Sequence, residues 1–307
     1  MCHSDYYPPV SIGNMNYTVR TPAVFHALSS LCLIPGDDNT FQAPVFPTFM
    51  PRIYGGQLLG QATVCSLLSL DDPNRLPHSL SASFLRPGTV EQPLYFHVND
   101  TVDGRSFSQR VISGNQNNHD IFLARVSLQK NENIDMSSLS APSVEKPENL
   151  PSSIDLFSSS QHPLAQTLHD INFADIRHSH STPALYINAD TQKKTFTTLW
   201  LRLREELPQQ TPQFIHRALL AYAADQFMLE PALRLHGLSW MHPHLSIASL
   251  DHNVWWHRNL DITQWIVAHI ELMSASDNRY LTRATFFQDD AHIATMTQEG
   301  VMRFTYD

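Results

Sequence analysis

The feature that most constrains the fold of this chain is a helix-like apolar segment followed by four strand-like segments, an order that occurs twice. The first helix candidate covers residues 55–70 and the second covers residues 214–229. Both are apolar nearly all round, and such a helix has to be enclosed by other elements. A sheet wrapped around a central helix is one economical enclosure, so we predict an α+β fold with two such halves.

The predicted strands are bounded by polar turn residues. In the first half they cover residues 78–86, 93–102, 106–116 and 120–129. In the second half one strand precedes the helix and four follow it, at residues 195–203, 245–258, 264–275, 279–288 and 291–304. Arg86 and Arg258 each end the first strand after their helix, and the later strands keep nearly the same separation. This order predicts an internal duplication.

The two halves are separated by residues 131–163, which are rich in Ser and Pro and lack a sustained apolar period. Such a composition is typical of a linker or a long surface loop. We therefore expect an N-terminal domain at residues 1–130, including an N-terminal extension, and a C-terminal domain at residues 164–307.

The composition narrows the class of partner. The net charge is −9, whereas nucleic acids and anionic membranes attract clustered Lys and Arg. No run approaches the roughly 18–20 apolar residues of a membrane span, and the N-terminus lacks the regions of a signal peptide. Cys2, Cys32 and Cys65 form no CxxC motif, so we expect no disulfide framework. We predict a cytoplasmic protein with no nucleic-acid partner and no membrane insertion.

Seventeen histidines raise the question of a metal site. The sequences HSH at 178–180 and HPH at 242–244 place two imidazoles on one side of an extended chain. No third ligand and no HExxH motif accompany them. We interpret them as solvated loop histidines and predict no metal and no redox cofactor.

The last predicted strand poses a chemical question. In AHIATMTQEGVMR, residues 291–303, side chains alternate between the two faces, and Gln298 falls on the apolar face. A buried amide without a hydrogen-bond partner costs about 1–3 kcal/mol. Gln298 is therefore expected to have a specific partner.

Six motifs along the chain occur together in a fixed order. They are RIYGGQLLGQA (52–62), SFLRPG (83–88), DGRSFSQRV (103–111), AYAADQFML (221–229), ASLDHNVWWHR (248–258) and QEGVMR (298–303). Together they resemble the acyl-CoA thioesterase II family, over roughly residues 50–130 and 195–304. The resemblance implies two hotdog domains in one chain, each a central helix wrapped by an antiparallel sheet. It also implies hydrolysis of an acyl-CoA substrate to free fatty acid and CoA without a cofactor, and it is compatible with a homo-oligomer.

By motif, the resemblance places the catalytic set of the family on Asp225, Ser249 and Gln298. Serine stands where many bacterial members carry threonine, and either hydroxyl can play the part. The partner of Gln298 would then be a water molecule shared with Asp225 and Ser249. In this hypothesis Asp225 accepts a proton from the water, while the other two side chains orient it toward the thioester carbonyl.

The helix pattern gives separate support for Asp225. We predict Thr211 as the N-cap and Pro212 as the first helical residue, so that Asp225 lies inside a helix continuing to Leu229. Residues three, four and seven positions away share its face, and they are Ala218, Ala221, Tyr222, Met228 and Leu229. An aspartate among such neighbours is expected to be paired or functional.

Other parts of the site follow less directly. Gly55 and Gly56 precede the first helix and either donate backbone N–H groups to the thioester oxygen or only form a tight turn. We expect an apolar acyl tunnel near the second helix, lined by Tyr222, Phe227, Met228 and Trp255. Residues 55–70 contain no Asp or Glu, so one active site per chain is expected.

The same residues allow alternative interpretations. Asp251 shares strand parity with Ser249 and is a second candidate for the catalytic carboxylate. An enoyl-CoA hydratase on the same double hotdog fold would need a His five residues after the Asp, and here that residue is Glu230. A non-catalytic protein that binds acyl-CoA stays open, because only thiol release distinguishes it. The serine-hydrolase motif GxSxG is absent.

Overall fold

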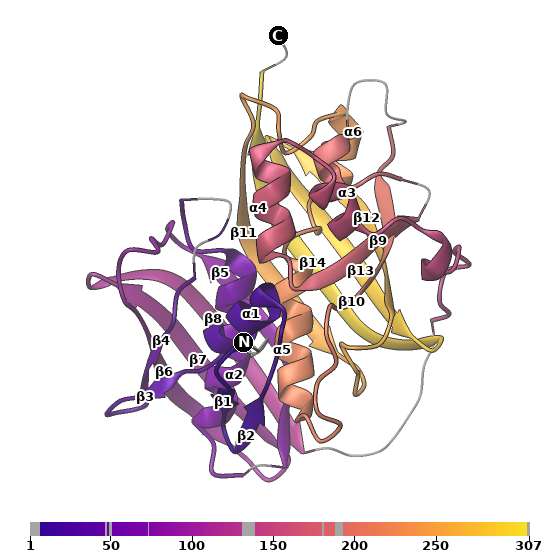
Figure 1. The fold of residues 1–307 in the computed structure, drawn as a ribbon. Helices are drawn as coiled ribbons and strands as arrows, with labels where there is room; N and C mark the ends of the chain where they lie inside the picture. Colours follow the sequence, from indigo (N-terminus) through magenta and orange to yellow (C-terminus); the bar gives the residue numbers. More distant parts are fainter. Residues whose placement is uncertain are drawn as a thin grey trace, which may run out of the picture.

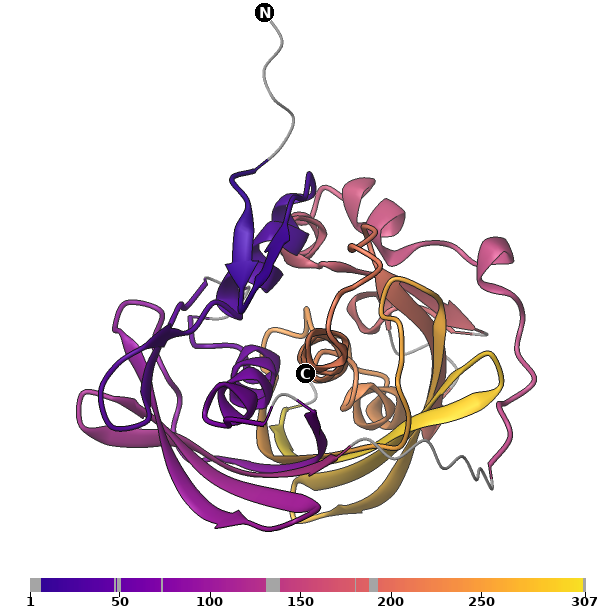
Figure 2. The same cartoon turned by 90° about the horizontal axis from the view of Figure 1, so that it is seen from below.

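The protein is described by a computed structural model that covers residues 7–46, 48, 51–72, 74–130, 139–179, 181–187 and 193–305. Two helices, α2 (Gly55–Leu68) and α5 (Gln213–Ala224), pack against each other on the concave side of one curved sheet (Figure 1 and Figure 2). Residues 56–66 of α2 are all buried, as predicted for a helix that is apolar nearly all round.

The strands of the large sheet fall into two groups. In the first half they are β3 (Ile34–Pro35), β4 (Thr40–Ala43), β5 (Arg75–Phe84), β6 (Leu94–Asp103), β7 (Phe107–Gln116) and β8 (His119–Lys130). In the second half they are β9 (Ala174–Ser179), β10 (Phe196–Leu203), β11 (Ser246–Trp256), β12 (Ile266–Ser276), β13 (Arg279–Gln288) and β14 (Ala291–Arg303). All nine predicted strands are confirmed, whereas the sequence pattern does not indicate the shorter strands β3, β4 and β9.

These twelve strands form one antiparallel sheet in the order β3-β4-β6-β7-β8-β5-β11-β14-β13-β12-β10-β9. The two halves meet where β5 pairs with β11, with Ser83 opposite Asp251 and Ser79 opposite Trp255. Each half therefore curves around its own helix, and the hydrogen-bonded sheet continues from one half into the other (Figure 2).

Three hairpins of the sheet close through two-residue turns in which both residues have positive φ. The pairs are Asn117–Asn118, Asp277–Asn278 and Asp289–Asp290. Asn and Asp adopt this left-handed conformation more readily than other non-glycine residues, and turns of this type match the twist of the adjoining strands. The turn residues thus fix the register of β7 with β8, β12 with β13, and β13 with β14.

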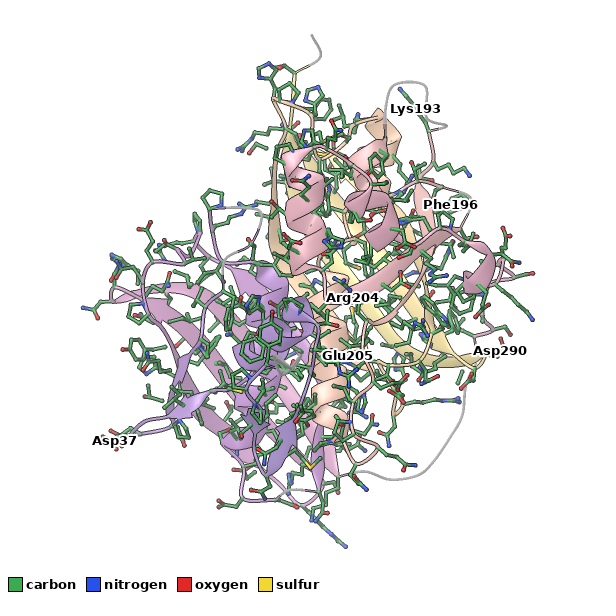
Figure 3. All side chains as sticks on the ribbon, viewed as in Figure 1. Asp37, Lys193, Phe196, Arg204, Glu205 and Asp290 are labelled. Atoms are coloured by element: carbon green, nitrogen blue, oxygen red, sulfur yellow. The ribbon has the colours of Figure 1, made fainter. Side chains whose placement is uncertain are left out.

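Smaller elements pack against the helix pair, the sheet or one another. They are β1 (Val10–Ile12), β2 (Met15–Tyr17), α1 (Pro22–Ser30), α3 (Ser153–Ser158), α4 (Pro163–Ile171), α6 (Glu230–His236) and the 3₁₀ turns Pro147–Asn149 and Ala184–Tyr186. Glu205 of the second half, labelled in Figure 3, lies near the helices of the first half. Its carboxylate accepts hydrogen bonds from the backbone N–H groups of Arg20 and Thr21, at 2.7 and 2.9 Å. This contact ties the start of α1 to the C-terminal half.

The segment 131–163 has more structure than a linker prediction describes. Residues 131–138 lie outside the described residues, but α3 follows within this segment. Phe157 of α3 is buried and packs with Leu168 and Leu185 in a small separate cluster. The second half therefore begins to pack before residue 164.

The structure corrects the prediction for the second helix. Pro212, rather than Thr211, is the N-cap residue, and α5 ends at Ala224, so that Asp225 is the C-cap residue and not an interior residue. The next N–H groups, of Gln226 and Phe227, bond three residues back, which is the tighter 3₁₀ spacing. The apolar pattern continues to Leu229 because this turn is itself packed into the core.

Among the described residues, the structure contains no helix that is both long and apolar enough to span a membrane.

Candidate active site

A cavity of about 430 Å³ lies between the beginning of α2 and the end of α5. Its apolar wall includes Leu58, Phe84, Leu229, Leu245 and Ile247, and its polar wall includes Arg52, Gly55, Asp225, Ser249 and Gln298. The three residues of the predicted catalytic set, which are far apart in the sequence, therefore border one space. Mostly apolar walls with a few convergent polar groups are typical of a small-molecule site.

Asp225 is held by donors from both halves of the chain. Its Oδ2 accepts a hydrogen bond from the backbone N–H of Gly56 at 2.9 Å, and its Oδ1 accepts one from Ser249 Oγ at 3.2 Å. The carboxylate thus lies at the positive N-terminal end of α2, which favours a negative charge. Burial nevertheless raises the pKa of Asp225 above its ordinary value, and the hydrogen bonds from Ser249 and Gly56 offset this only in part. A carboxylate with a raised pKa is a stronger base than an exposed one.

Two glycines allow the helices to approach this closely. A Cβ atom on Gly56 would lie 2.2 Å from the carbonyl oxygen of Tyr222, and one on Gly55 would lie 2.8 Å from Asp225 Oδ2. Neither distance is compatible with a side chain. The N–H of Gly56 is already engaged by Asp225, so the predicted donation of both glycine N–H groups to a substrate oxygen is now an expectation for Gly55 alone.

Gln298 connects the site to the core. It is fully buried on β14, on the apolar face as predicted. Its Nε2 donates to Ser249 Oγ at 2.8 Å, and its Oε1 lies 2.7 Å from Nδ1 of His252. Its partners in the structure are therefore two side chains of β11, in addition to any water shared with Asp225.

A β-bulge in β11 decides which side chains face the cavity. Ser249 is opposite Gly300 and Asp251 is opposite Glu299, so Leu250 is an extra residue in the ladder. The bulge reverses the alternation, and the parity argument that placed Asp251 beside Ser249 is therefore wrong. Asp251 accepts a hydrogen bond from the N–H of Glu299 at 3.2 Å and does not line the cavity.

The same bulge brings His252 to the inner face, where it is fully buried. The sequence pattern does not indicate His252, because strict alternation puts its side chain on the other face of the strand from Ser249. Arg52 was also missed as a cavity residue, although it directly precedes the glycine pair in RIYGG; its Nη2 donates to the carbonyl of Ile247 at 2.6 Å.

The first half repeats this geometry with apolar residues. In β5 the bulge follows Pro77, and the next inward residue, Leu80, pairs with Val126 of β8. In β11 the bulge follows Ser249, and the next inward residue is His252. Leu80 and Val126 are both buried, and no residue of α2 carries a carboxylate. The duplicated position in the first half therefore lacks the polar groups of the second.

The four residues predicted to line an acyl tunnel lie in three different places in the structure. Tyr222 lines a neighbouring pocket of about 50 Å³, not the main cavity. Phe227 and Met228 are buried in the hydrophobic core. Trp255 is 40% exposed, because on β11 it lies on the outer face. None of these four lines the main cavity, whose apolar wall comes instead from Leu58, Phe84, Leu229, Leu245 and Ile247.

The interpretation of the histidine pairs as solvated loop residues is wrong for His178, which is buried on β9. His178 Nε2 lies 2.9 Å from Glu230 Oε2 in a buried pair, and His242 Nδ1 accepts the N–H of His244; His180 lies outside the described residues. Within the part of the chain that the structure describes, no three His, Cys, Asp or Glu side chains gather in a way that could hold a metal ion.

Comparisons with known proteins cover both halves. Residues 171–301 match a family model described as acyl-CoA thioesterase, and residues 43–129 match one described as acyl-CoA thioesterase N-terminal domain. Acyl-CoA thioesterase 2 of Haemophilus influenzae is 27% identical over 273 residues, which cover 88% of this chain and 94% of that protein.

Two solved structures extend the comparison. An acyl-CoA thioesterase II (TesB2) of Mycobacterium marinum is 28% identical, covers 90% of this chain and 97% of its own, and has a TM-score of 0.72. A protein with a hot dog fold from Alicyclobacillus acidocaldarius is 17% identical and has a TM-score of 0.71; the match covers 92% of this chain and 99% of that chain. The latter likeness concerns the fold alone, and with the observed architecture it identifies two hotdog domains in one chain.

Proposed function

The chain belongs to the acyl-CoA thioesterase family, and we propose that it hydrolyses acyl-CoA with a water molecule activated by Asp225, Ser249 and Gln298. The products are a free fatty acid and the CoA thiol. The observation that carries this assignment is the hydrogen-bonded series from Gln298 through Ser249 to Asp225, which ends at the wall of the cavity.

The acyl chain is proposed to lie against the apolar wall formed by Leu58, Leu229 and Ile247. Its thioester carbonyl then faces Asp225 at the polar end of the same cavity. Such an arrangement holds the reacting carbon and the water at close range, which lowers the entropic cost of reaction.

Asp225 is the proposed general base. Ser249 uses its own proton in the bond to Asp225, so its oxygen can only accept further hydrogen bonds. A water molecule that donates one proton to the carboxylate and the other to Ser249 Oγ, and that accepts the second Nε2 hydrogen of Gln298, would keep one oxygen lone pair free for attack. Asp225 removes the proton as the new C–O bond forms.

The carbonyl oxygen gains negative charge in the tetrahedral intermediate. Gly55 is the first residue of α2 and borders the cavity, and its N–H is the proposed donor at this positive helix end. When the intermediate collapses, the C–S bond breaks, and the proton on Asp225 passes to the departing thiolate. Every atom of the water is then accounted for in the acid and the thiol.

The test measures release of free thiol from decanoyl-CoA by the wild type and by Asp225→Asn. We expect wild-type turnover and a loss of at least about a hundredfold in the variant, since a positioned base typically contributes 10²- to 10⁴-fold. Binding of decanoyl-CoA without thiol release by the wild type would instead identify a non-catalytic binding protein. Near-normal turnover by Asp225→Asn would refute the role of this carboxylate.

The cytoplasm is the proposed location. Cys32 and Cys65 are both free thiols in the structure, as expected in a reducing compartment. Association into a homo-oligomer stays a prediction from the resemblance.

A further inference from the structure

A buried histidine outside the proposed catalytic set contacts that set directly. His252 of β11 is opposite Gln298 of β14 in the ladder, and its Nδ1 lies 2.7 Å from Gln298 Oε1. Both side chains are fully buried. A hydrogen bond between them is therefore shielded from competition with solvent.

His252, Gln298, Ser249 and Asp225 form a hydrogen-bonded series, and the carboxylate of Asp225 determines which atom donates in each bond. An ionised Asp225 only accepts, so Ser249 must donate its single proton to it. Ser249 Oγ must then accept from the amide of Gln298, which directs Nε2 toward Ser249 and Oε1 toward His252. Because Oε1 only accepts, the ring of His252 must carry its proton on Nδ1.

The alternative orientation of the amide would break the series. With Oε1 directed at Ser249, the serine proton would be drawn to the amide, and Asp225 would lose this donor. That orientation would turn the Nε2 hydrogens of the amide toward His252 Nδ1. The ring would then have to carry its proton on its own Nε2, which is buried and, among the described residues, has no partner to accept it. The ring stays neutral under ordinary conditions, since burial lowers the pKa of His252 to about 4.

Packing of the sheet does not by itself require a histidine at this place. The Nε2 of His252 is buried and, among the described residues, has no hydrogen-bond partner, which is costly for a polar atom in a core. The duplicated half shows that the same place in the sheet can be filled otherwise, because there Leu80 pairs with Val126. The polar pair occurs in the half that carries the carboxylate.

We propose that His252 is a positioning residue, which fixes the amide of Gln298 so that its N–H is directed at Ser249. This inference rests on the proposed function of Asp225, Ser249 and Gln298. His252 does not touch substrate in this assignment and acts on hydrolysis only through Gln298.

The test compares three substitutions at this position. His252→Leu carries the residue of the duplicated half and removes the donor, and His252→Phe removes it while keeping a ring. His252→Asn places an amide N–H close to where Nδ1 was. We expect kcat for decanoyl-CoA to fall about tenfold or more in His252→Leu and His252→Phe with KM little changed, and to be largely restored in His252→Asn.

Two further variants separate positioning from general loss of structure. Thr282→Val removes another buried neighbour of Gln298, whose hydroxyl donates at 3.4 Å to the Gln298 backbone carbonyl and not to the amide; kcat should be unchanged. In a Gln298→Leu background, His252→Leu should lower kcat by no more than about twofold, because residues that act as one unit are strongly non-additive.

The outcomes distinguish this inference from the proposed function. If Asp225→Asn and Gln298→Leu each lower kcat at least about tenfold while folded His252→Leu or His252→Phe keeps normal kcat, the positioning role is overturned and the proposed function stands. Equal losses in His252→Asn and His252→Phe, or full additivity with Gln298→Leu, also overturn it. If Asp225→Asn is itself fully active, the proposed function has failed first.

Discussion

Replacing Gly56 by alanine tests the contact between the two helices on which the site depends. The added Cβ would lie 2.2 Å from the carbonyl oxygen of Tyr222. An ordinary contact needs a separation near 3.4 Å, so the helices must move apart by about 1.2 Å at this point. Because the obstacle is backbone of α5 and not a flexible side chain, a rotamer change cannot relieve it.

The same displacement acts on Asp225, the proposed catalytic carboxylate. The bond from the Gly56 N–H to Asp225 Oδ2 is 2.9 Å long, and lengthening it by about 1 Å takes it beyond hydrogen-bonding range. Overpacking of a core typically costs about 1–3 kcal/mol, and the lost bond to a charged acceptor about 1.5–3 kcal/mol. We expect Gly56→Ala to lose several kcal/mol of unfolding free energy and at least about tenfold in kcat for decanoyl-CoA.

Gly60→Ala provides the matched control one turn further along α2. There the nearest atoms to an added Cβ are Leu31 Cδ2 at 3.2 Å and the carbonyl oxygen of Ala218 at 3.3 Å, so small shifts suffice. Alanine also favours a helix interior by roughly 1 kcal/mol over glycine. Thermal unfolding and thiol release are measured for both variants. If Gly56→Ala is as stable and as active as Gly60→Ala, the close approach of the helices is not required and the reasoning fails.

Three further outcomes are expected. Because burial raises the pKa of Asp225, kcat/KM should fall on acidification through a pKa above that of an exposed aspartate. A raised pKa also means that protonation of Asp225 favours the folded state. The wild type should therefore gain unfolding free energy relative to Asp225→Asn as the pH is lowered through that pKa. Leu80→Ala should lose about 2–5 kcal/mol of unfolding free energy without changing kcat per folded molecule, and a large change in kcat would mean that the first half also takes part in catalysis. Trp255→Ala should leave kcat and KM for decanoyl-CoA within about twofold of wild type, since exposed positions away from a site have small effects; a marked rise in KM would place this residue in the substrate site after all.

The architecture was readable from the sequence because its determinants are local. Apolar helices without a polar face, alternating strands and paired Asn or Asp turns each fix one element, and their repetition fixes the two halves. The short strands β3, β4 and β9 carry too few residues for a period to be recognised. The end of α5 was misjudged because packing of Phe227 and Met228 into the core continues the apolar pattern beyond the helix.

The site was readable only in part. The motifs indicated Asp225, Ser249 and Gln298, and the structure brings all three to one cavity. The bulge at Leu250 has no sequence signal of its own, and it alone decides that His252 and not Asp251 faces inward. The cavity wall was equally unreadable, because apolar residues that line a cavity look the same in a sequence as those that fill a core.

The pairing of β5 with β11 has a consequence for how this protein can be divided. Cutting the chain between its halves would expose β5 in one fragment and β11 in the other as edge strands. Their unpaired peptide groups could then bond to strands of other chains. It would also separate Gly55 and Gly56 from Asp225, whose carboxylate accepts a hydrogen bond from the Gly56 N–H. The two halves therefore complete each other, and under the proposed function neither half alone would hold a complete reaction centre.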